Sequence, residues 1–427
     1  MGEKQKEVLL ITYYWPPGGG PGVHRWLRFS KFFHAYGAKL HVYCPKDAAW
    51  PIRDEKLQDE VVPEVKEVRR TVFEPHKYLG KKNNPNVGGG LTKKKKSSFF
   101  QDLIIWIRGN LFVPDARRFW INPSYRFLKG YLKKHPEIQC IISTGPPHSL
   151  HVIALKLKRK TGIRWIADFR DPWTDIDFYE ELKIGERADR KQKALELACL
   201  KEADEVITVS ESCASGLEEI GQRSVQVVTN GFIFPDFDSR KQNLGNLFSI
   251  THFGSMPSSR NPVVLWKALQ ELIHEGKLMM SEVRIKLYGP VDHVVFDSIQ
   301  QHGLMELLEY TELVTHQESI ALQRSTPLLL LVANQTGNVQ GILTGKFFEY
   351  LGAKRPILAI GSKGSDLDKA MTHTSSGAFV DFEDVERAKE VLLEYAQQFQ
   401  TDSLYIEAKN LQDYSSENLA KKIVEMC

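Results

Sequence analysis

The chain has 427 residues, and its 57 Lys or Arg against 53 Asp or Glu give a formal net charge of +4. This length predicts two domains with sizeable cores, and a charged fraction of 26% excludes wholesale disorder. No run of about 18 apolar residues occurs and the first residues resemble a strand, so neither a membrane span nor a signal peptide is expected.

Strand and helix patterns alternate along the first half of the chain. An apolar run predicts a buried strand, and after a Pro/Gly loop a helix runs to a glycine cap. Strands separated by helices predict parallel βαβ units with helices on both faces of a sheet. The predicted strands are 7–14, 40–45, 140–145, 164–169, 205–210 and 225–231, and the main helices are 25–37, 149–162 and 186–202.

The same rhythm restarts after a polar stretch at 235–246, which predicts a second domain. We therefore expect an α/β protein of two doubly wound Rossmann-like domains facing a central cleft, with ligand at the carboxyl ends of the strands. The domains are expected at 1–238 and 247–400, followed by a helical segment at 401–427 for which packing back on the first domain is considered. The predicted strands are 248–255, 283–290, 328–335, 356–361 and 377–382, with helices at 262–276 and 345–355.

The first strand-to-helix loop, at 15–25, is rich in glycine, which allows close backbone approach, and it ends at a helix N-terminus suited to an anion. It is no dinucleotide fingerprint, because Val23 occupies the place of the third glycine, and no G-K-[ST] completes a P-loop. A plain flexible turn is the alternative interpretation. His24 and Arg25 favour function, since both are expected to point into the cleft.

Two later loops carry polar residues where strands end. His148 follows the strand at 140–145, and a lone histidine is as readily structural as catalytic. Asp168, Arg170 and Asp171 end the next strand, where charges need a ligand or one another. Either an Asp–Arg pair braces two loops, or Asp168 or Asp171 binds sugar hydroxyls or handles an acceptor proton.

The second domain has two candidate phosphate sites. Small residues including Ser255 and then Arg260 follow the strand at 248–255, and a cation beside helix amides suits a diphosphate. Gly345 and Lys346 open a helix, with Glu349 three residues on along the same face. Lys346 can meet phosphate oxygens and Glu349 both ribose hydroxyls. A surface salt bridge of about 0.2–0.5 kcal/mol is the alternative.

The motifs at 11–25, 167–173, 207–210, 229–232 and 345–361, in this order, resemble a GT-B glycosyltransferase of family 4, of the bacterial surface-polysaccharide type. The resemblance spans almost the whole chain. It implies a retaining transferase that uses a nucleotide diphosphate sugar as donor substrate, without a bound metal or other cofactor. The second domain would hold the nucleotide, and the first would hold a glycan or lipid-linked acceptor.

The same resemblance assigns individual roles. Glu349 matches the second Glu of the family's E-x7-E motif, which grips ribose, and Lys346 matches a lysine that faces the diphosphate. Two positions depart from the pattern: Gly341 replaces the first Glu, and Arg170 stands where many relatives carry His. The predicted roles are catalytic for Asp171, His148 and Arg170, donor binding for Gly19, Gly20, Ser255, Arg260, Gly345, Lys346 and Glu349, and acceptor binding for His24, Arg25 and Asp168.

The net charge hides a one-sided distribution. Residues 65–134 carry 17 Lys or Arg and 4 Asp or Glu, a net +13 that leaves −9 for the rest. Within it, 93–112 places four lysines beside Phe, Ile and Trp, the composition of an interfacial helix. The prediction is a cytoplasmic protein, peripheral on the inner face of the plasma membrane, that binds no nucleic acid. Core aromatics beside an ordinary lysine loop are the alternative.

Two other functions remain open on the same residues. A nucleotide-sugar epimerase uses this fold and needs no acceptor, whereas a non-catalytic membrane-attached assembly factor would bind nucleotide sugar without turnover. The absent Glu at 341 is the best support for the second. The five cysteines are scattered and lack C-x-x-C spacing, which argues against a disulfide framework or zinc site and fits a reducing compartment.

Overall fold

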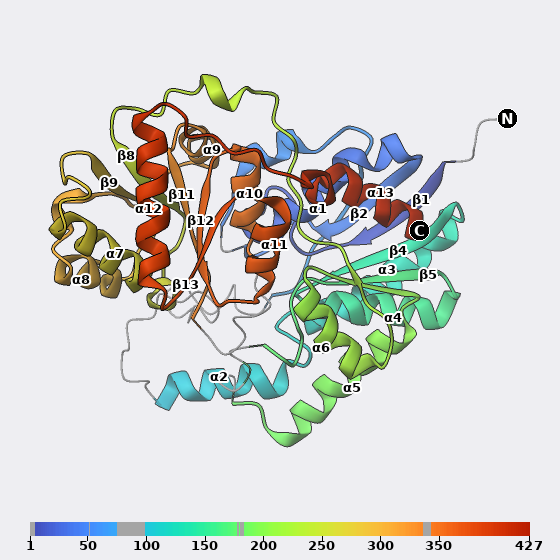
Figure 1. Cartoon of the computed structure of the whole chain (residues 1–427). Helices are drawn as coiled ribbons and strands as arrows, with labels where there is room; N and C mark the ends of the chain where they lie inside the picture. The colour runs from blue at the N-terminus through green and yellow to red at the C-terminus, as the bar shows by residue number, and fades with distance from the viewer. Residues whose placement is uncertain (1–4, 51, 75–98, 177–178, 180–182, 336–342) are drawn as a thin grey trace. The chain divides into compact units, whose positions relative to one another are not determined.

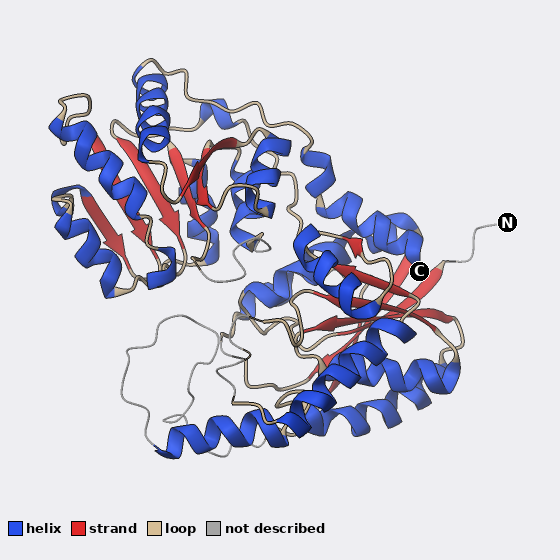
Figure 2. Ribbon diagram, turned by 60° about the horizontal axis from the view of Figure 1, so that its bottom comes forward, coloured by secondary structure: helices blue, strands red, loops and turns tan. Residues whose placement is uncertain are grey.

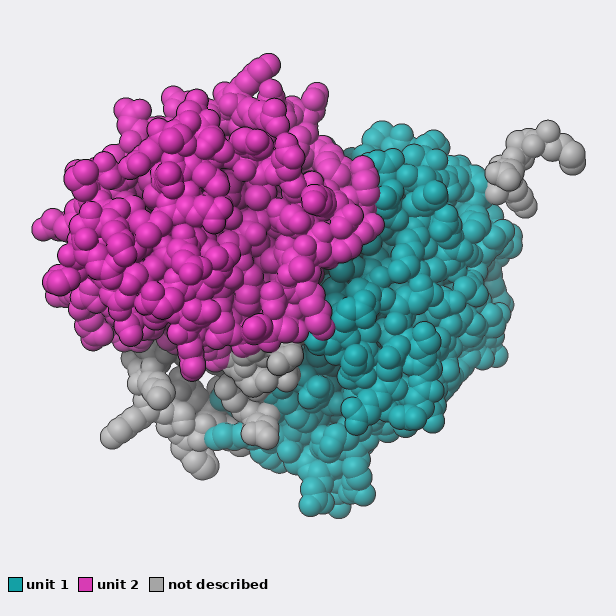
Figure 3. Space-filling model, viewed as in Figure 1, with its two compact units in different colours: residues 1–88, 94–231, 415–427 teal, residues 89–93, 232–414 magenta. Residues whose placement is uncertain are grey.

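A computed structural model describes residues 5–50, 52–74, 99–176, 179, 183–335 and 343–427. The described chain divides into two compact units (Figure 3). Unit 1 comprises the residues up to Gly231 together with Ser415–Cys427, and unit 2 comprises Phe232–Tyr414. The chain therefore leaves unit 1 once, builds unit 2, and returns to unit 1 for its last helix.

Unit 1 is a seven-stranded, wholly parallel sheet in the order β3-β2-β1-β4-β5-β6-β7, covered by helices on both faces (Figures 1 and 2). Its strands are β1 (Lys6–Ile11), β2 (Ala38–Pro45), β3 (Lys66–Arg70), β4 (Ile138–Gly145), β5 (Arg164–Phe169), β6 (Glu205–Thr208) and β7 (Gln226–Val227). Its α-helices are α1 (Pro21–Phe33), α2 (Phe99–Leu111), α3 (Arg118–Lys134), α4 (Ser149–Thr161), α5 (Glu186–Glu202), α6 (Glu211–Gly221) and α13 (Ser416–Met426).

Each face of this sheet carries its own core. In β1, Leu9 and Ile11 join a cluster with α3, α4 and α5, whereas Val8 and Leu10 join a cluster with α1 and α13. Successive strand residues point to opposite faces, and both faces are covered, so the strand appears in the sequence as a continuous apolar run. The parallel sheet of βαβ units predicted from the sequence is confirmed.

Unit 2 is a six-stranded parallel sheet in the order β10-β9-β8-β11-β12-β13. In β11, Leu328 and Leu330 pack with α7 and α12, and Leu329 and Leu331 pack with α10 and α11. Its strands are β8 (Phe248–Phe253), β9 (Val283–Tyr288), β10 (Leu308–Thr311), β11 (Leu328–Val332), β12 (Ile357–Gly361) and β13 (Gly377–Asp381). Its α-helices are α7 (Val263–His274), α8 (His293–Gln301), α9 (His316–Arg324), α10 (Gly345–Ala353), α11 (Asp366–Thr374) and α12 (Val385–Gln400).

The basic segment at 65–134 contains a helix, α2, within the stretch 93–112 for which an interfacial helix was considered. It also contains β3 and α3, which the sequence analysis did not assign, and α3 buries Trp120, Leu128 and Leu132 against the sheet. The lysines at 93–96 lie outside the described residues. Within the described parts of the chain, every helix is too short or too polar to cross a bilayer.

Candidate functional site

Two glycines shape the carboxyl edge of the unit 2 sheet. Gly254 follows β8 with φ of 94°, and Gly289 follows β9 with φ of 118°, both in the region that favours glycine. A Cβ on Gly254 would lie 2.5 Å from Lys346 Cε and 2.7 Å from its Nζ, and a Cβ on Gly289 would lie 2.7 Å from the Gly254 carbonyl carbon. The Lys346 side chain therefore packs directly against backbone at a position where two glycines carry no side chains.

Lys346 belongs to the first turn of α10, whose N-terminus has no side-chain cap. Thr344 is the N-cap residue, and its buried Oγ1 has no partner among the described residues. The first amides of a helix leave donors unsatisfied and carry positive partial charge, which favours an anion. A lysine ammonium and a helix N-terminus thus converge on one point beside Gly254.

Arg260 brings a second cation to this point. Its Nε donates to Asn334 Oδ1 at 2.5 Å and its Nη1 to the Ser255 carbonyl at 3.3 Å, so the Ser255 loop is held against the end of β11. Burial lowers the pKa of Lys346 to about 8, repulsion from Arg260 adds to the shift, and Glu349 opposes it. Burial lowers the pKa of Arg260 as well, and Glu349 is the carboxylate that acts on Lys346. We call Lys346 and Arg260 the cation pair.

The neighbouring His252 adds no charge to the cation pair. Burial and then Lys346 lower the pKa of His252 to about 3, so this histidine is neutral at physiological pH. Tyr350 fixes α10 to the sheet, because its hydroxyl accepts from the Phe253 amide at 3.1 Å and lies 3.4 Å from the Leu330 carbonyl. A fixed pair of cations with little countercharge is suited to a diphosphate.

The structure therefore brings together five of the donor-site residues predicted from sequence: Ser255, Arg260, Gly345, Lys346 and Glu349. Glu349 is half-buried one turn along α10 from Lys346, and its negative charge raises the pKa of that lysine. Gly341 lies outside the described residues. Asn334 and Gly254 were missed by sequence reasoning, although a glycine directly after a predicted strand was a visible signal.

The glycine loop of unit 1 is packed more tightly than the sequence suggested. The Gly19 amide donates to the Ile52 carbonyl at 2.9 Å, and a Cβ on Gly18 would lie 2.8 Å from the Trp50 indole nitrogen. Gly20 is the N-cap residue of α1 with φ of 89°. The Gly19 amide is thus already used within the protein, and the donor contacts assigned to Gly19 and Gly20 remain predictions.

Arg25 and Asp168 form a buried, two-point ion pair between α1 and β5. Arg25 Nε and Nη2 donate to the two carboxylate oxygens of Asp168 at 3.1 and 2.9 Å, and the residues are 3% and 0% exposed. Trp26 and Thr144 each donate to the same carboxylate at 2.8 Å. The alternative considered from sequence was an Asp–Arg pair that braces two loops, whereas the observed pair joins α1 to β5 through Arg25. A direct acceptor contact by Arg25 or Asp168 stays a prediction. His24 lies on the first turn of α1, half-buried.

Arg170 joins the first turn of α1 to the end of β4 at the carboxyl edge of the unit 1 sheet. Its guanidinium donates to the carbonyls of Gly22, Gly145 and Pro146. Burial lowers the pKa of this guanidinium, and Asp171 opposes the shift. Partial loss of water around the neighbouring Asp171 carboxyl raises its pKa, with Arg170 opposing, although the residue keeps exposed surface. The Arg170 guanidinium is thus bound to backbone carbonyls, and Asp171 is the exposed carboxyl that follows it in the chain. The catalytic roles of Arg170 and Asp171 stay predictions.

His148 is buried at the start of α4 and stacks on Trp173, with ring centroids 4.6 Å apart. Its Nδ1 has no partner among the described residues. Burial lowers its pKa well below the ordinary value, and His151 and Arg170 add to that shift. The ring is therefore neutral, and a catalytic role for His148 would require it to accept a proton as a weak base.

Among the described residues, no group of three or more His, Cys, Asp or Glu side chains could hold a metal ion.

The amino-acid sequence matches no protein-family model and no curated protein. Its fold, in contrast, matches solved structures over almost the whole chain. A mutant of S. aureus TarM in complex with fondaparinux, α-GlcNAc-glycerol and UDP is 11% identical, with a TM-score of 0.57, covering 99% of each chain. Sucrose-phosphate synthase from Thermosynechococcus elongatus is 13% identical, with a TM-score of 0.55, covering 98% of this chain and 94% of that one.

A putative UDP-N-acetylglucosamine 2-epimerase from Listeria monocytogenes has the same architecture, with 9% identity, a TM-score of 0.52, and coverage of 98% of this chain and 95% of that one. These likenesses show that the chain has the GT-B fold of two Rossmann-like units, which confirms the fold predicted from sequence. At such low identity they establish the fold alone.

Proposed function

We propose that the protein is a glycosyltransferase that moves a sugar from a nucleotide diphosphate sugar to a glycan or lipid-linked acceptor, with retention, in cell-surface polysaccharide synthesis. The observation that carries the proposal is the cation pair at the N-terminus of α10, where Lys346 and Arg260 lie with little countercharge. Transfer requires a leaving diphosphate, and fixed cations stabilise the charge that develops on it. A bound metal is not needed for that task in this proposal.

In this mechanism unit 2 binds the donor and unit 1 the acceptor. Lys346 and Arg260 neutralise the diphosphate, the amides of α10 donate to it, and Glu349 accepts from the ribose hydroxyls. On unit 1, Asp171 is the exposed carboxyl beside Arg170 and is proposed to take the acceptor proton. Arg25, Asp168 and Arg170 hold the loops from which the acceptor would be bound.

The pH dependence of nucleotide binding tests the donor site. Because Lys346 has a pKa of about 8, it loses its charge as the pH rises above 8, whereas a bound diphosphate holds the proton on the ammonium. Thermal shift and calorimetry with UDP-, GDP- and ADP-sugars should identify a cognate ligand, and its affinity should be about tenfold weaker at pH 9.5 than at pH 7.5.

Two variants serve as controls for this titration. In Lys346→Arg the guanidinium stays charged throughout, so the affinity for the nucleotide sugar should not change across this pH range. Lys363 is an exposed lysine of the same unit, and Lys363→Ala should behave as wild type. Binding by no nucleotide sugar, or a wild-type affinity that does not change with pH, would count against the donor site. A sugar epimer released without any acceptor would instead indicate an epimerase, and binding without turnover would indicate the assembly factor.

We further propose that unit 1 contacts an anionic membrane surface on the cytoplasmic side. An aromatic patch consists of Phe73, Phe112 and Phe119. The ring centroids of Phe73 and Phe112 lie 5.9 and 5.8 Å from that of Phe119, and the Arg118 guanidinium lies over the Phe119 ring. Phe73 is 57% and Phe119 43% exposed, and Trp106 on α2 is 46% exposed. Exposed aromatics beside cations suit the lipid interface.

Vesicle flotation at low salt should recover wild-type protein with vesicles containing phosphatidylglycerol, and about tenfold less with pure phosphatidylcholine. The double variant Trp106→Ser, Phe119→Ser should lose most of this binding, whereas Tyr405→Ser, an exposed aromatic of unit 2, should keep it. Equal recovery with both lipids, or none with the anionic vesicles, would exclude this partner.

A further inference from the structure

Two cysteines of unit 1 meet in one core cluster near the end of α13. Cys140 is fully buried in β4, in register with Val8 of β1 and Arg164 of β5. Cys427 directly follows α13 and packs against the same core cluster that contains Cys140. Interaction with Cys427 is the largest cause of the raised pKa of the Cys140 thiol, which agrees with this shared packing. Two cysteines 287 positions apart in the chain thus belong to one region of the unit 1 core.

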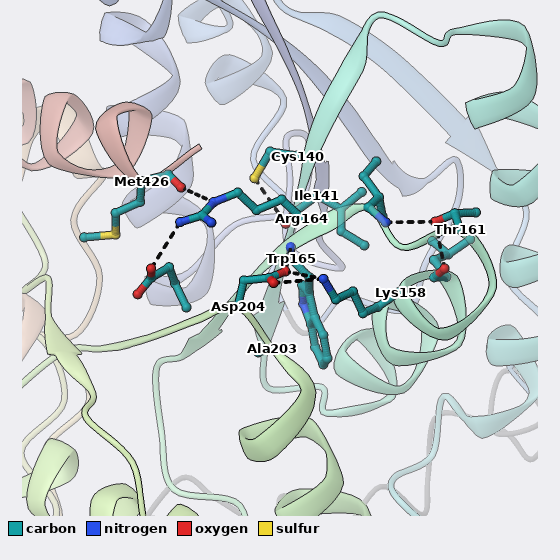
Figure 4. Close-up of polar contacts among 12 residues, drawn as sticks. Cys140, Ile141, Lys158, Thr161, Arg164, Trp165, Ala203, Asp204 and Met426 are labelled. Atoms are coloured by element: carbon teal, nitrogen blue, oxygen red, sulfur yellow. Dashed lines mark hydrogen bonds and ion pairs between the residues drawn. The ribbon is translucent and has the colours of Figure 1, made fainter.

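Two cations hold the last turn of α13 at this place. Arg164 Nε donates to the Met426 carbonyl at 2.6 Å, as Figure 4 shows beside Cys140, and Lys6 Nζ donates to the Val424 carbonyl at 3.2 Å. Cations that bind the last carbonyls of a helix satisfy otherwise unpaired acceptors and favour its dipole. Because both cations extend from the sheet, Cys427 is held next to Cys140.

We propose that Cys140 and Cys427 form a disulfide under oxidising conditions, which fastens α13 covalently to β4. Cys427 is partly exposed, whereas Cys140 is completely buried, so an oxidant reaches Cys427 first. Cys44 and Cys199 are buried, and Cys213 is partly exposed on α6.

The reaction is thiol–disulfide exchange with a small-molecule disulfide such as oxidised glutathione. The Cys427 thiolate attacks one sulfur, the small disulfide bond breaks, and one glutathione thiolate leaves and takes up a proton. The Cys140 thiolate then attacks Cys427 in the mixed disulfide and releases the second glutathione. Contact with Cys427, and then burial, raise the pKa of the Cys140 thiol, so the second step is the slow one.

The bond would secure the point at which the chain returns from unit 2. The chain leaves unit 1 after Gly231 and re-enters it at Ser415, so unit 2 lies within the loop that the disulfide closes. A cross-link over so long a loop restricts the unfolded chain strongly, which stabilises the folded state. Oxidation is therefore expected to raise the thermal midpoint of unit 1, and a reductant should reverse the rise.

The folded full-length chain is treated with oxidised glutathione at pH 8, alkylated, digested and measured by mass spectrometry. Wild-type protein should yield a peptide pair linked through Cys140 and Cys427, lighter than the two reduced peptides by two hydrogen atoms. Cys140→Ser should stop at the first step, with glutathione retained on Cys427. Cys427→Ser should give neither product and no change in thermal midpoint, and Cys213→Ser should form the same link as wild type.

Three results would overturn the proposal. They are alkylation of both thiols in oxidised wild-type protein, a glutathione adduct that persists on wild-type Cys427, and a link from Cys427 to Cys213 in place of Cys140. The Cys427→Ser variant changes only a partly exposed side chain, so it keeps the test valid if the buried Cys140→Ser change prevents folding.

Discussion

Replacing Lys346 by alanine should lower turnover about 100- to 1000-fold, because the removal of one fixed donor to a developing charge typically costs ~2.7–4 kcal/mol. Its ammonium lies against the Gly254 backbone, and Arg260 is close enough to lower its pKa. Release of nucleoside diphosphate from the cognate donor, measured at pH 7.5, gives the rate. Lys363→Ala should keep wild-type turnover.

The same variant should remain folded, which separates a functional loss from a structural one. The pKa of Lys346 is about 8 in the folded chain against an ordinary value of 10.5, so below pH 8 the buried charge costs stability. Between pH 8 and 10.5 the Lys346 side chain binds more protons in the unfolded chain than in the folded chain. The free energy of unfolding of the wild type therefore increases with pH over this range through this group. Lys346→Ala should lack that gain and be no less stable at pH 7. Near-normal turnover by Lys346→Ala would refute the assignment of Lys346 to the donor site.

The fold was predictable because its signal is local. Strands buried on both faces appear as apolar runs, and helices between them show their own period, so β8, β11 and α10 could be placed from the sequence. The basic segment misled this reasoning, since its many lysines and arginines obscured the apolar positions of α3, which are Trp120, Leu128 and Leu132. The first strand was predicted to run to residue 14 but ends at Ile11, ahead of the Pro16–Pro17 turn.

The candidate site was predictable only in part. Lys346 and Glu349 share one helix, so their spacing was enough to place them on one face. Asn334, which holds Arg260, comes from another strand end, and no sequence spacing gives that pairing. Likewise Asp168 looked like a ligand-binding carboxylate at a strand end, because its partner Arg25 lies 143 positions away on α1. Tertiary contacts decide which charges are paired within the protein.

The Arg25–Asp168 ion pair leads to the largest expected effect on stability. Replacing Arg25 by methionine leaves the fully buried Asp168 carboxylate with only Trp26 and Thr144 as donors. Breaking a buried pair by removing one partner costs about 3–5 kcal/mol, because the remaining charge is uncompensated. Urea unfolding of unit 1, followed by its tryptophan fluorescence, should show a loss of that size for Arg25→Met.

A surface pair supplies the comparison. Arg159 and Glu202 are 56% and 36% exposed, so Arg159→Met should cost about 0–1 kcal/mol. The double variant Arg25→Met, Asp168→Leu should recover much of the loss, because no buried charge remains. If Arg25→Met proves as mild as Arg159→Met, the pair does not brace α1 against β5, and the acceptor role predicted for both residues becomes the better explanation of why charges stand at this strand end.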